Sequence, residues 1–245
     1  MFKAELRADT LKGLVNIIST LIDEVKFTVT PDGMSLKAVD PAHVAMVELI
    51  VEKEAFESYE ADETELGVDL DKVKDVLKLA GSGDIISMEQ DSDRGRLVFK
   101  VGNITRRMNL VDTSSINDPK VPEFNLKGTV KVPVTELQRG IKASESISDH
   151  ITLIAGEDLF ELLCEGDTDS ADLKLNGSQS VIINSPERVG STFPLDYFSN
   201  LVKAIPSDVT VTIKLDDDYP VEIDFKLADD NGTVRYLLAP RIEND

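Results

Sequence analysis

The sequence predicts an α+β protein made of two tandem copies of one domain, in which helices pack on antiparallel strands. Three observations support this fold class. The chain repeats its own pattern at a shift of 126 and then of 125 positions. Each half also alternates short strand-like segments with two amphipathic helical segments, and a stretch with two prolines separates the halves.

The internal repeat consists of two runs. A shift of 126 positions superimposes Leu11 on Leu137, Val15 on Ile141, Leu21 on Ile147, Asp23 on Asp149, Val25 on Ile151, Leu36 on Leu162 and Leu49 on Leu175. A shift of 125 superimposes Leu70 on Leu195, Asp71 on Asp196, Val73 on Phe198, Val76 on Leu201 and Lys78 on Lys203. Each run joins a helical pattern to a strand pattern, so we favour a duplicated domain over a chance likeness of unrelated segments. We predict an N-terminal domain over 1–113, a connector over 114–129 and a C-terminal domain over 130–245.

In the first half, apolar residues at helical spacing follow Thr10 and predict a helix that ends near Ile22, with Thr10 as its N-cap. A second helix is predicted over 71–80, where Gly81 marks its end. The acidic segment 52–65 is expected to be mainly loop. Strands are predicted over 2–8, 26–29, 35–39, 44–51, 84–90, 96–101 and 106–111.

In the second half, Thr135 and Gln138 have the spacing of a capping box, which predicts a helix that runs through Ile147. A fourth helix is predicted over 195–205, and Pro206 ends it. Strands are predicted over 151–154, 159–164, 171–175, 181–183, 209–215, 221–227 and 233–238.

The connector over 114–129 contains Pro119 and Pro122. Each proline removes a backbone donor and disfavours a helical conformation in the residue before it, so the connector is expected to be extended. It also carries apolar side chains that another part of the protein should cover: Val121, Pro122, Phe124 and Leu126.

Composition excludes several classes of protein. The 245 residues include no Trp and only 5% aromatic residues, which argues against stacking platforms for single-stranded nucleic acid. The one cysteine, Cys164, excludes a disulfide framework and a CxxC zinc motif. Every apolar run is shorter than the roughly 18 residues that cross a membrane, so we expect no membrane partner.

The net charge is −20, from 46 acidic and 26 basic residues, and this sum argues against a nucleic-acid partner. The net charge alone does not decide this question, because the two signs are separated along the chain. Basic residues recur on the predicted helices, while acidic residues concentrate in predicted loops and turns. Exposed helices commonly carry lysines, but their recurrence in both halves makes a DNA-facing surface an equally good interpretation. Lysines without bidentate arginines would attract phosphates without distinguishing bases.

Motifs for catalysis or metal binding are missing. The two histidines, His43 and His150, have no metal-ligand spacing. Asp167 and Asp169 resemble the start of a calcium loop that lacks its later glycine and glutamate. No nucleophile, base and orienting group can be assembled, so the sequence predicts a protein that is not an enzyme and that binds neither a cofactor nor a metal ion.

Three segments give a specific resemblance to a known family. They are the loop Val39-Asp40-Pro41-Ala42-His43-Val44, the connector motif Val121-Pro122-Glu123, and the closing strand and tail Tyr236-Leu237-Leu238-Ala239-Pro240-Arg241-Ile242. With the two-copy plan, they resemble the archaeal and eukaryotic sliding clamps, the proliferating cell nuclear antigen family, over the full length. Asp40-Pro41-Ala42 and the compact connector are similar to the archaeal members.

The resemblance implies a closed homotrimeric ring of the DNA clamp fold, with helices lining the hole and sheets forming the outer wall. It implies a non-enzymatic processivity factor that encircles double-stranded DNA without sequence preference and tethers replication and repair enzymes. The implied partners are DNA polymerase, flap endonuclease and DNA ligase, which would bind through short peptide motifs, and a separate clamp loader. The location would be cytoplasmic, at the nucleoid, in an archaeon, and nuclear in a eukaryote.

The same resemblance implies three sets of site residues. Those facing DNA would be Lys12, Lys72, Lys78, Arg139, Lys142 and Lys203. Those binding partner peptides would be Val39, His43, Val44, Met46, Val121, Pro122, Leu126, Pro220, Tyr236, Leu238, Ala239, Pro240 and Ile242, although Val44, Met46 and Leu238 could equally be core residues. Those at the subunit interface would be Arg106, Arg107, Met108, Leu110, Leu173 and Leu175.

Two alternatives to the homotrimeric clamp stay open. Within the family, the chain could be one subunit of a heterotrimeric or checkpoint-type clamp. From another class, the aspartate clusters could belong to an acidic metal-dependent hydrolase. That hypothesis predicts that calcium, magnesium or zinc shifts the melting temperature, and that alanine at Asp167 and Asp169 abolishes the shift.

Overall fold

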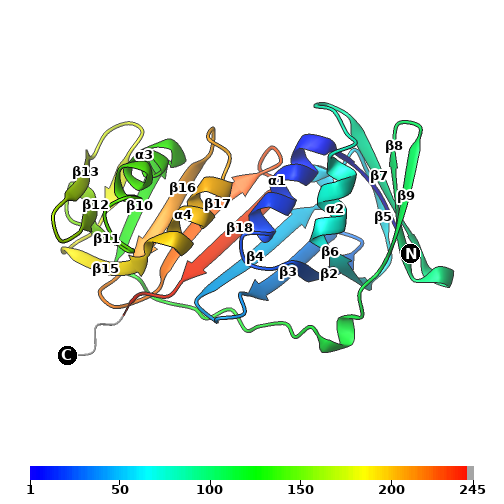
Figure 1. The fold of residues 1–245 in the computed structure, drawn as a ribbon, viewed down its shortest axis with the longest axis horizontal. Coiled ribbons are helices and arrows are strands. Elements are labelled where there is room, and N and C mark those ends of the chain that lie inside the picture. Colours follow the sequence, from blue (N-terminus) through cyan, green and yellow to red (C-terminus); the bar gives the residue numbers. More distant parts are fainter. Residues whose placement is uncertain (242–245) are drawn as a thin grey trace. The chain divides into compact units, whose positions relative to one another are not determined.

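The computed structural model describes residues 1–241, which form two compact units (Figure 1). Unit 1 comprises residues 1–41, 47–121 and 226–234. Unit 2 comprises residues 42–46, 122–225 and the chain from Arg235 onward. Each unit therefore contains a short segment that lies, in the sequence, within the other half of the chain.

Unit 1 contains two helices on one face of two antiparallel sheets (Figure 1). One sheet has the strand order β5-β1-β7-β8-β9, and the other contains β6-β2-β3-β4. The elements are β1 (Phe2–Arg7), α1 (Ala8–Ile18), β2 (Glu24–Thr30), β3 (Gly33–Val39), β4 (Ala45–Glu52), β5 (Ser58–Ala61), β6 (Thr64–Asp69), α2 (Leu70–Leu77), β7 (Ile85–Asp91), β8 (Arg96–Val101) and β9 (Ile104–Asn109), with short 3₁₀ turns η1 (Lys53–Ala55), η2 (Ser92–Arg94) and η3 (Thr113–Ser115).

Unit 2 repeats this plan strand for strand. Its sheets have the orders β14-β10-β16-β17-β18 and β15-β11-β12-β13, which correspond position by position to those of unit 1. The elements are β10 (Gly128–Pro133), α3 (Val134–Ser144), β11 (His150–Ala155), β12 (Leu159–Glu165), β13 (Ser170–Asn176), β14 (Ile182–Asn184), β15 (Val189–Pro194), α4 (Leu195–Ala204), β16 (Thr210–Leu215), β17 (Val221–Leu227) and β18 (Gly232–Leu238). The α+β fold class and the duplicated domain are confirmed.

The helices begin earlier than their sequence signals indicate. Thr10 is not an N-cap, because α1 starts at Ala8 directly after β1. Thr135 and Gln138 form no capping box, because α3 starts at Val134 and Gln138 instead donates to the carbonyl oxygens of Val202 and Ile205 at 3.4 and 3.2 Å. Both predictions of a side-chain cap were wrong.

Distant backbone carbonyls satisfy the first amides of the helices. The amide of Ala8 donates to Asp84 at 2.8 Å, and that of Val134 donates to Val209 at 3.0 Å. The first amides of α2 and α4 do the same with Asp23 and Asp149. A first-turn amide must find a partner, but that partner can come from a neighbouring strand. Only α2 adds a side-chain cap, from Asp69.

Four strands went unpredicted: β5, β6, β10 and β15. The acidic segment 52–65, expected to be loop, contains β5 and the first residues of β6. β5 pairs with β1, β6 pairs with β2, and β15 pairs with β11, each of them at a sheet edge. Charged residues are common on edge strands, where they suppress pairing with other chains, and in β5 and β6 they hid the strand pattern.

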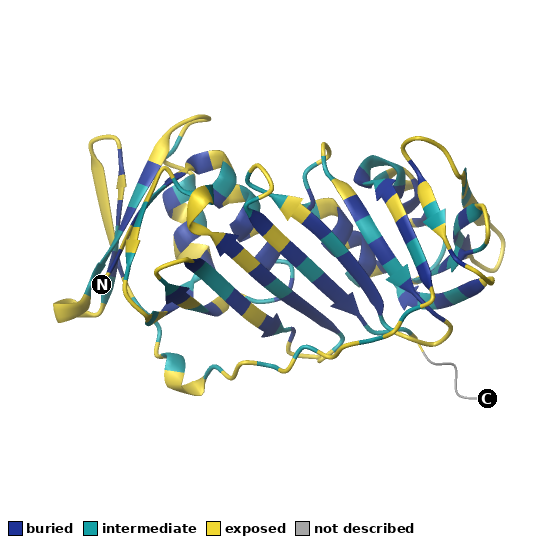
Figure 2. Ribbon diagram, turned by 180° about the vertical axis from the view of Figure 1, so that it is seen from behind, coloured by how far each residue is buried: buried dark blue, intermediate teal, exposed yellow. Residues whose placement is uncertain are grey.

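The cores lie between the helices and the sheets. Buried and exposed residues alternate along the strands, as the period of two requires (Figure 2). In α1 the buried residues Leu11, Leu14, Val15 and Ile18 form one face, and in α3 Leu137 and Ile141 take the equivalent places. The opposite helical faces are exposed and carry the basic residues discussed below.

Candidate functional site

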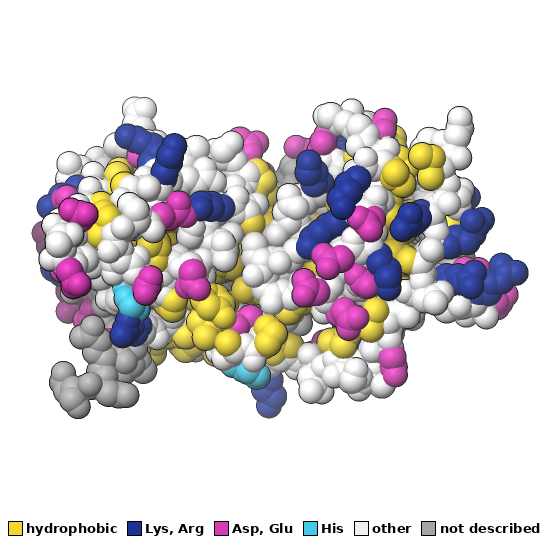
Figure 3. Space-filling model, viewed as in Figure 1, with side chains coloured by type: hydrophobic (Ala, Val, Ile, Leu, Met, Phe, Trp, Pro, Cys, Tyr) yellow, Lys and Arg dark blue, Asp and Glu magenta, His cyan; other side chains and the backbone are white. Residues whose placement is uncertain are grey.

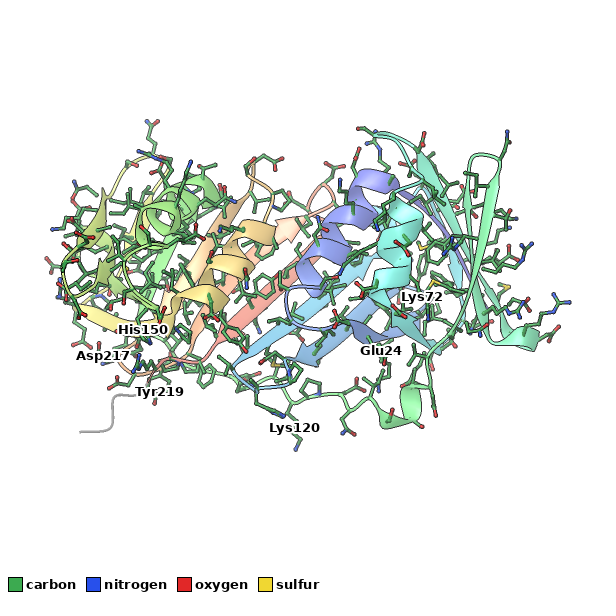
Figure 4. All side chains as sticks on the ribbon, in the orientation of Figure 1. Glu24, Lys72, Lys120, His150, Asp217 and Tyr219 are labelled. Carbon is green, nitrogen blue, oxygen red and sulfur yellow. The ribbon has the colours of Figure 1, made fainter. Side chains whose placement is uncertain are left out.

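The six basic residues expected to face DNA all lie exposed on the helices. Lys12 is on α1, and Lys78 directly follows α2 as its C-cap. Lys72 is on α2 (Figure 4). Arg139 and Lys142 are on α3, and Lys203 is on α4. Each pair of helices packs side by side within its unit, so every unit presents basic side chains on one helical face.

Acidic neighbours accompany most of these cations. Nζ of Lys72 lies 2.8 Å from Oδ2 of Asp69, and Nζ of Lys78 lies 2.7 Å from Oδ1 of Asp75. Figure 3 shows acidic and basic side chains intermingled over the helices of unit 1. The hydrogen bond that each lysine donates to its aspartate raises the pKa of the lysine and lowers the pKa values of Asp69 and Asp75. Exposed pairs of this kind add little stability, so they remain available for exchange with phosphate oxygens.

In unit 2 the ion pairs differ between the helices. Arg139 contacts Glu136 on the same helix at 3.0 Å. Lys203 of α4 instead bonds to Glu145 at the end of α3, and Glu145 also accepts a 2.9 Å hydrogen bond from the hydroxyl of Ser199. These bonds lower the pKa of Glu145 and tie the two helices together. Among residues 1–241, Lys12 and Lys142 form no ion pair.

Part of the predicted peptide-binding set is core. The exposed fractions of Met46, Tyr236 and Leu238 are 7%, 0% and 0%. Tyr236 packs against Phe225 with its ring centre 5.8 Å away. These three side chains support the surface from beneath, and the interpretation of Met46 and Leu238 as core residues agrees with their burial.

The other members are accessible. Within unit 2, the amide of Ala239 donates to the carbonyl oxygen of Val44 at 2.9 Å, which brings the tail and the loop before β4 together. His43 lies exposed in that loop with a left-handed φ of 59°. The remaining accessible members of unit 2 are Pro122, Leu126, Pro220 and Pro240. Val39 and Val121 lie half-buried in unit 1, and Ile242 lies outside the described residues.

Sequence reasoning missed an aromatic pair at this surface. The rings of Phe124 and Tyr219 meet edge to face with centres 6.0 Å apart, and Tyr219 is 49% exposed (Figure 4). Phe124 comes from the connector and Tyr219 from the turn between β16 and β17. The available signal in the sequence was an aromatic residue, Tyr219, placed between three aspartates and Pro220 in a predicted polar turn, where a large apolar side chain is unusual.

The residues predicted for the subunit interface lie on two open sheet edges. β9 is the last strand of its sheet in unit 1, and β13 is the last strand of its sheet in unit 2. Arg106 and Arg107 on β9 are exposed, and with Lys72, Met108 and Asn109 they line a surface hollow of about 280 Å³. Met108 is buried, whereas Leu110, Leu173 and Leu175 are half-buried.

The internal repeat explains why these two edges matter. β18 is the counterpart of β9, and it lies hydrogen-bonded beside β4, the counterpart of β13. The amide of Glu52 donates to Asn231 at 2.8 Å near one end of this pair, and Ala239 donates to Val44 near the other. The chain therefore joins one such pair of edges and leaves the equivalent pair, β9 and β13, open.

Two aspartates of the turn between β16 and β17 bind the protein's own backbone. Oδ1 of Asp217 accepts from the amide of Gly190 at 2.7 Å, and Oδ1 of Asp216 accepts from the amide of Asp217 at 2.9 Å. Within residues 1–241, no group of three His, Cys, Asp or Glu side chains is arranged to hold a metal ion. In the same range, none of the helices combines the length and apolar character that crossing a membrane requires.

Comparison with known proteins identifies the family. Residues 1–116 match the family model of the N-terminal domain of proliferating cell nuclear antigen, and residues 120–241 match that of its C-terminal domain. This chain belongs to the proliferating cell nuclear antigen family. A relative named DNA polymerase sliding clamp from Methanosarcina barkeri is 40% identical over 246 residues, which cover 100% of both chains. The protein of the same name from Halobacterium salinarum is 38% identical, again over the whole of both chains.

Solved structures of the family have the same fold. The proliferating cell nuclear antigen of A. fulgidus, solved with the C-terminal region of FEN-1 bound, superimposes with a TM-score of 0.93 at 30% identity and covers 100% of both chains. That of Thermococcus kodakaraensis superimposes with a TM-score of 0.91 over 98% of this chain and 100% of that one, at 22% identity.

Proposed function

We propose that this chain is a DNA polymerase sliding clamp, in which three copies close into a ring around duplex DNA. Full-length relatives that carry this name support the proposal. The observation that carries it is the open pair of edges, β9 and β13, whose counterparts β18 and β4 are already joined within the chain. Repeating that joint between copies would hide both edges, and a head-to-tail contact of this kind forms a ring when its rotation closes.

Basic residues on the helices support contact with DNA. Lys12 and Lys142 carry charge that no acidic residue within 1–241 neutralises, whereas Lys72, Lys78, Arg139 and Lys203 exchange partners at little cost. Such cations bind phosphates and do not distinguish bases, and they allow a protein to move along the duplex. The chain as a whole has a net charge of −20, so its other faces are strongly acidic and would disfavour DNA.

The accessible apolar residues of unit 2 support binding of a partner peptide. Val44, Pro240 and the aromatic pair of Phe124 and Tyr219 offer rigid apolar area, the kind of surface in which a peptide anchor is buried. The A. fulgidus relative was solved with the C-terminal region of FEN-1, so a flap endonuclease is the first partner to test. By the same likeness we infer that polymerase, ligase and a clamp loader also bind, that the clamp is not itself an enzyme, and that it acts in the archaeal cytoplasm.

Light scattering followed by a DNA retention assay tests the function. A solution mass near three chains of 26.9 kDa, at low and at high salt, is expected. After loading onto nicked circular DNA by an archaeal clamp loader, the ring should stay bound through a gel-filtration column and be lost once the circle is linearised. A monomer at every salt concentration would contradict the homotrimer and indicate a clamp subunit that needs other chains. Equal retention on circular and linear DNA would contradict encirclement.

A further inference from the structure

The connector begins as a fixed part of unit 1. The amide of Val111 donates to the carbonyl oxygen of Gly67 at 2.8 Å, which attaches the chain to β6. A side chain at Gly67 would clash, because its Cβ would lie 2.1 Å from the oxygen of Val111. Asp112 then caps the η3 turn by accepting from the amide of Ser114 at 2.9 Å. The first residues after β9 are therefore held by backbone contacts.

A lysine of the sheet holds the next part of the connector. Lys26 lies on β2 with its side chain only 9% exposed, and its Nζ is 2.8 Å from Oδ2 of Asp118 and 3.5 Å from Oε1 of Glu65. The hydrogen bond with Asp118 raises the pKa of Lys26 against the opposing effect of burial. A largely buried ammonium group is costly unless it is paired, so Lys26 strongly favours the position in which Asp118 reaches it.

The far end of the connector is attached to unit 2. Phe124 packs on Tyr219, and Nζ of Lys127 lies 2.6 Å from Oε1 of Glu187. Between these anchors lies the span 119–123, which makes no hydrogen bond or ion pair to any other part of the described chain. Its Lys120 points away from the ribbon (Figure 4). Val121 and Pro122, two members of the proposed peptide-binding set, fall within this span.

We propose that Lys26 is a positioning residue for partner binding: by holding Asp118 it sets one end of the span 119–123 and so prepares Val121 and Pro122 to receive a peptide. This inference rests on the proposed function. A connector already held in place loses less conformational freedom when a peptide orders it. Without the ion pair, the span that moves freely extends back to η3, and more of the binding free energy is spent on ordering it.

The test compares Asp118→Asn and Lys26→Met with the wild-type protein, using the C-terminal region of A. fulgidus FEN-1 as the probe peptide. Isothermal titration should give an affinity about three- to tenfold weaker for either variant. The double variant should be no weaker than Lys26→Met alone, because both changes break the same contact. Lys53→Met is the matched control, since it removes an exposed pair with Asp32 in the same unit at 3.2 Å and should leave the affinity unchanged.

A second measurement separates positioning from a general loss of structure. Hydrogen exchange of the amides over 116–123 should accelerate in Asp118→Asn without peptide, while the oligomer mass and the melting temperature stay close to wild type. Asp118 is about half exposed, so this variant keeps the inference testable if Lys26→Met fails to fold. Wild-type affinity in Asp118→Asn would overturn the role of Lys26 and leave the proposed function standing. Failure of the wild-type protein to bind the probe would overturn both.

Discussion

The two units share every helix and strand and differ in the size of the side chains at equivalent core positions. Unit 1 encloses an apolar cavity of about 60 Å³, whose lining includes Val15 of α1 and Val73 of α2. In unit 2 the equivalent positions hold the larger residues Ile141 and Phe198, both fully buried. The same backbone plan therefore accepts cores of different volume, because topology depends on the apolar pattern and packing depends on side-chain size.

The equivalent strands β18 of unit 2 and β9 of unit 1 differ in the ion pairs of their arginines. Arg235 of β18 has its Nε 3.0 Å from Asp224 and 3.6 Å from Glu222. Its counterpart on β9, Arg107, lies opposite Val98 in the strand register and forms no ion pair within residues 1–241. The joined edge thus has an internal ionic network, whereas the open edge presents unpaired cations. That contrast agrees with β18 having a structural role and β9 an intermolecular one.

The largest expected effect follows from changing the open edge. Replacing both Arg106 and Arg107 by Asp should reduce the mass in solution from about three chains to one, because two exposed charges are reversed on the strand proposed to pair with β13. The melting temperature of the dissociated chain should change little, since both side chains are exposed. Light scattering measures the mass, and Arg94→Asp, in the η2 turn, is the control that should stay trimeric. A trimer in the double variant would contradict the assignment of β9.

Removing the counterpart arginine should affect folding. Arg235→Met leaves Glu222, which is largely buried, with fewer cationic partners, and should lower the free energy of unfolding by about 2 kcal/mol. Arg107→Met should change it by less than about 0.5 kcal/mol. Urea denaturation of the two variants measures the difference. Equal losses of stability in the two variants would contradict a structural role that Arg235 of β18 has and Arg107 of β9 lacks.

The buried lysine gives a pH dependence that the equivalent position of unit 2 lacks. Lys26 has Thr152 as its counterpart, which pairs with Thr192 through neutral hydroxyl groups 2.8 Å apart. The pKa of Lys26 is raised above 10.5 in the folded protein, so its contribution to stability is complete below pH 10.5 and declines as the pH rises through the raised value. The difference in melting temperature between wild type and Lys26→Met should therefore shrink above pH 10.5. A difference in melting temperature that stays constant up to pH 12 would contradict a stabilising role of the charged Lys26.

The smallest expected effect concerns the cavity. Val15→Ile adds one methylene that unit 2 already has at Ile141, and should raise the free energy of unfolding by up to about 0.8 kcal/mol. The reciprocal change, Ile141→Val, should lower it by about 1 kcal/mol, because it removes a methyl group from a fully buried side chain. Chemical denaturation of both variants provides the comparison. Destabilisation by Val15→Ile would indicate that the cavity cannot accept the additional methyl group without strain.

Local patterns accounted for much of the fold. Apolar periodicity and turn residues indicated the four helices and most strands, and the repeat indicated two copies, because each of these signals is contained within a few neighbouring residues. The missed edge strands and the misplaced helix starts have different causes. β5 and β6 are edge strands whose charges conceal their period, and the helix starts depend on distant carbonyl groups, such as those of Asp84 and Val209 just before β7 and β16.

For the candidate sites, the sequence by itself determined which residue types are present: basic residues on helices, apolar residues in the connector and tail, and a duplicated set of strands. Tertiary structure decided their roles. It buried Tyr236 and Leu238, paired Phe124 with Tyr219, and joined Lys26 to Asp118 across 92 positions of sequence. It also left β9 and β13 as open edges. Burial, ion pairing and edge exposure depend on which distant segments meet, and a local pattern carries no information about those meetings.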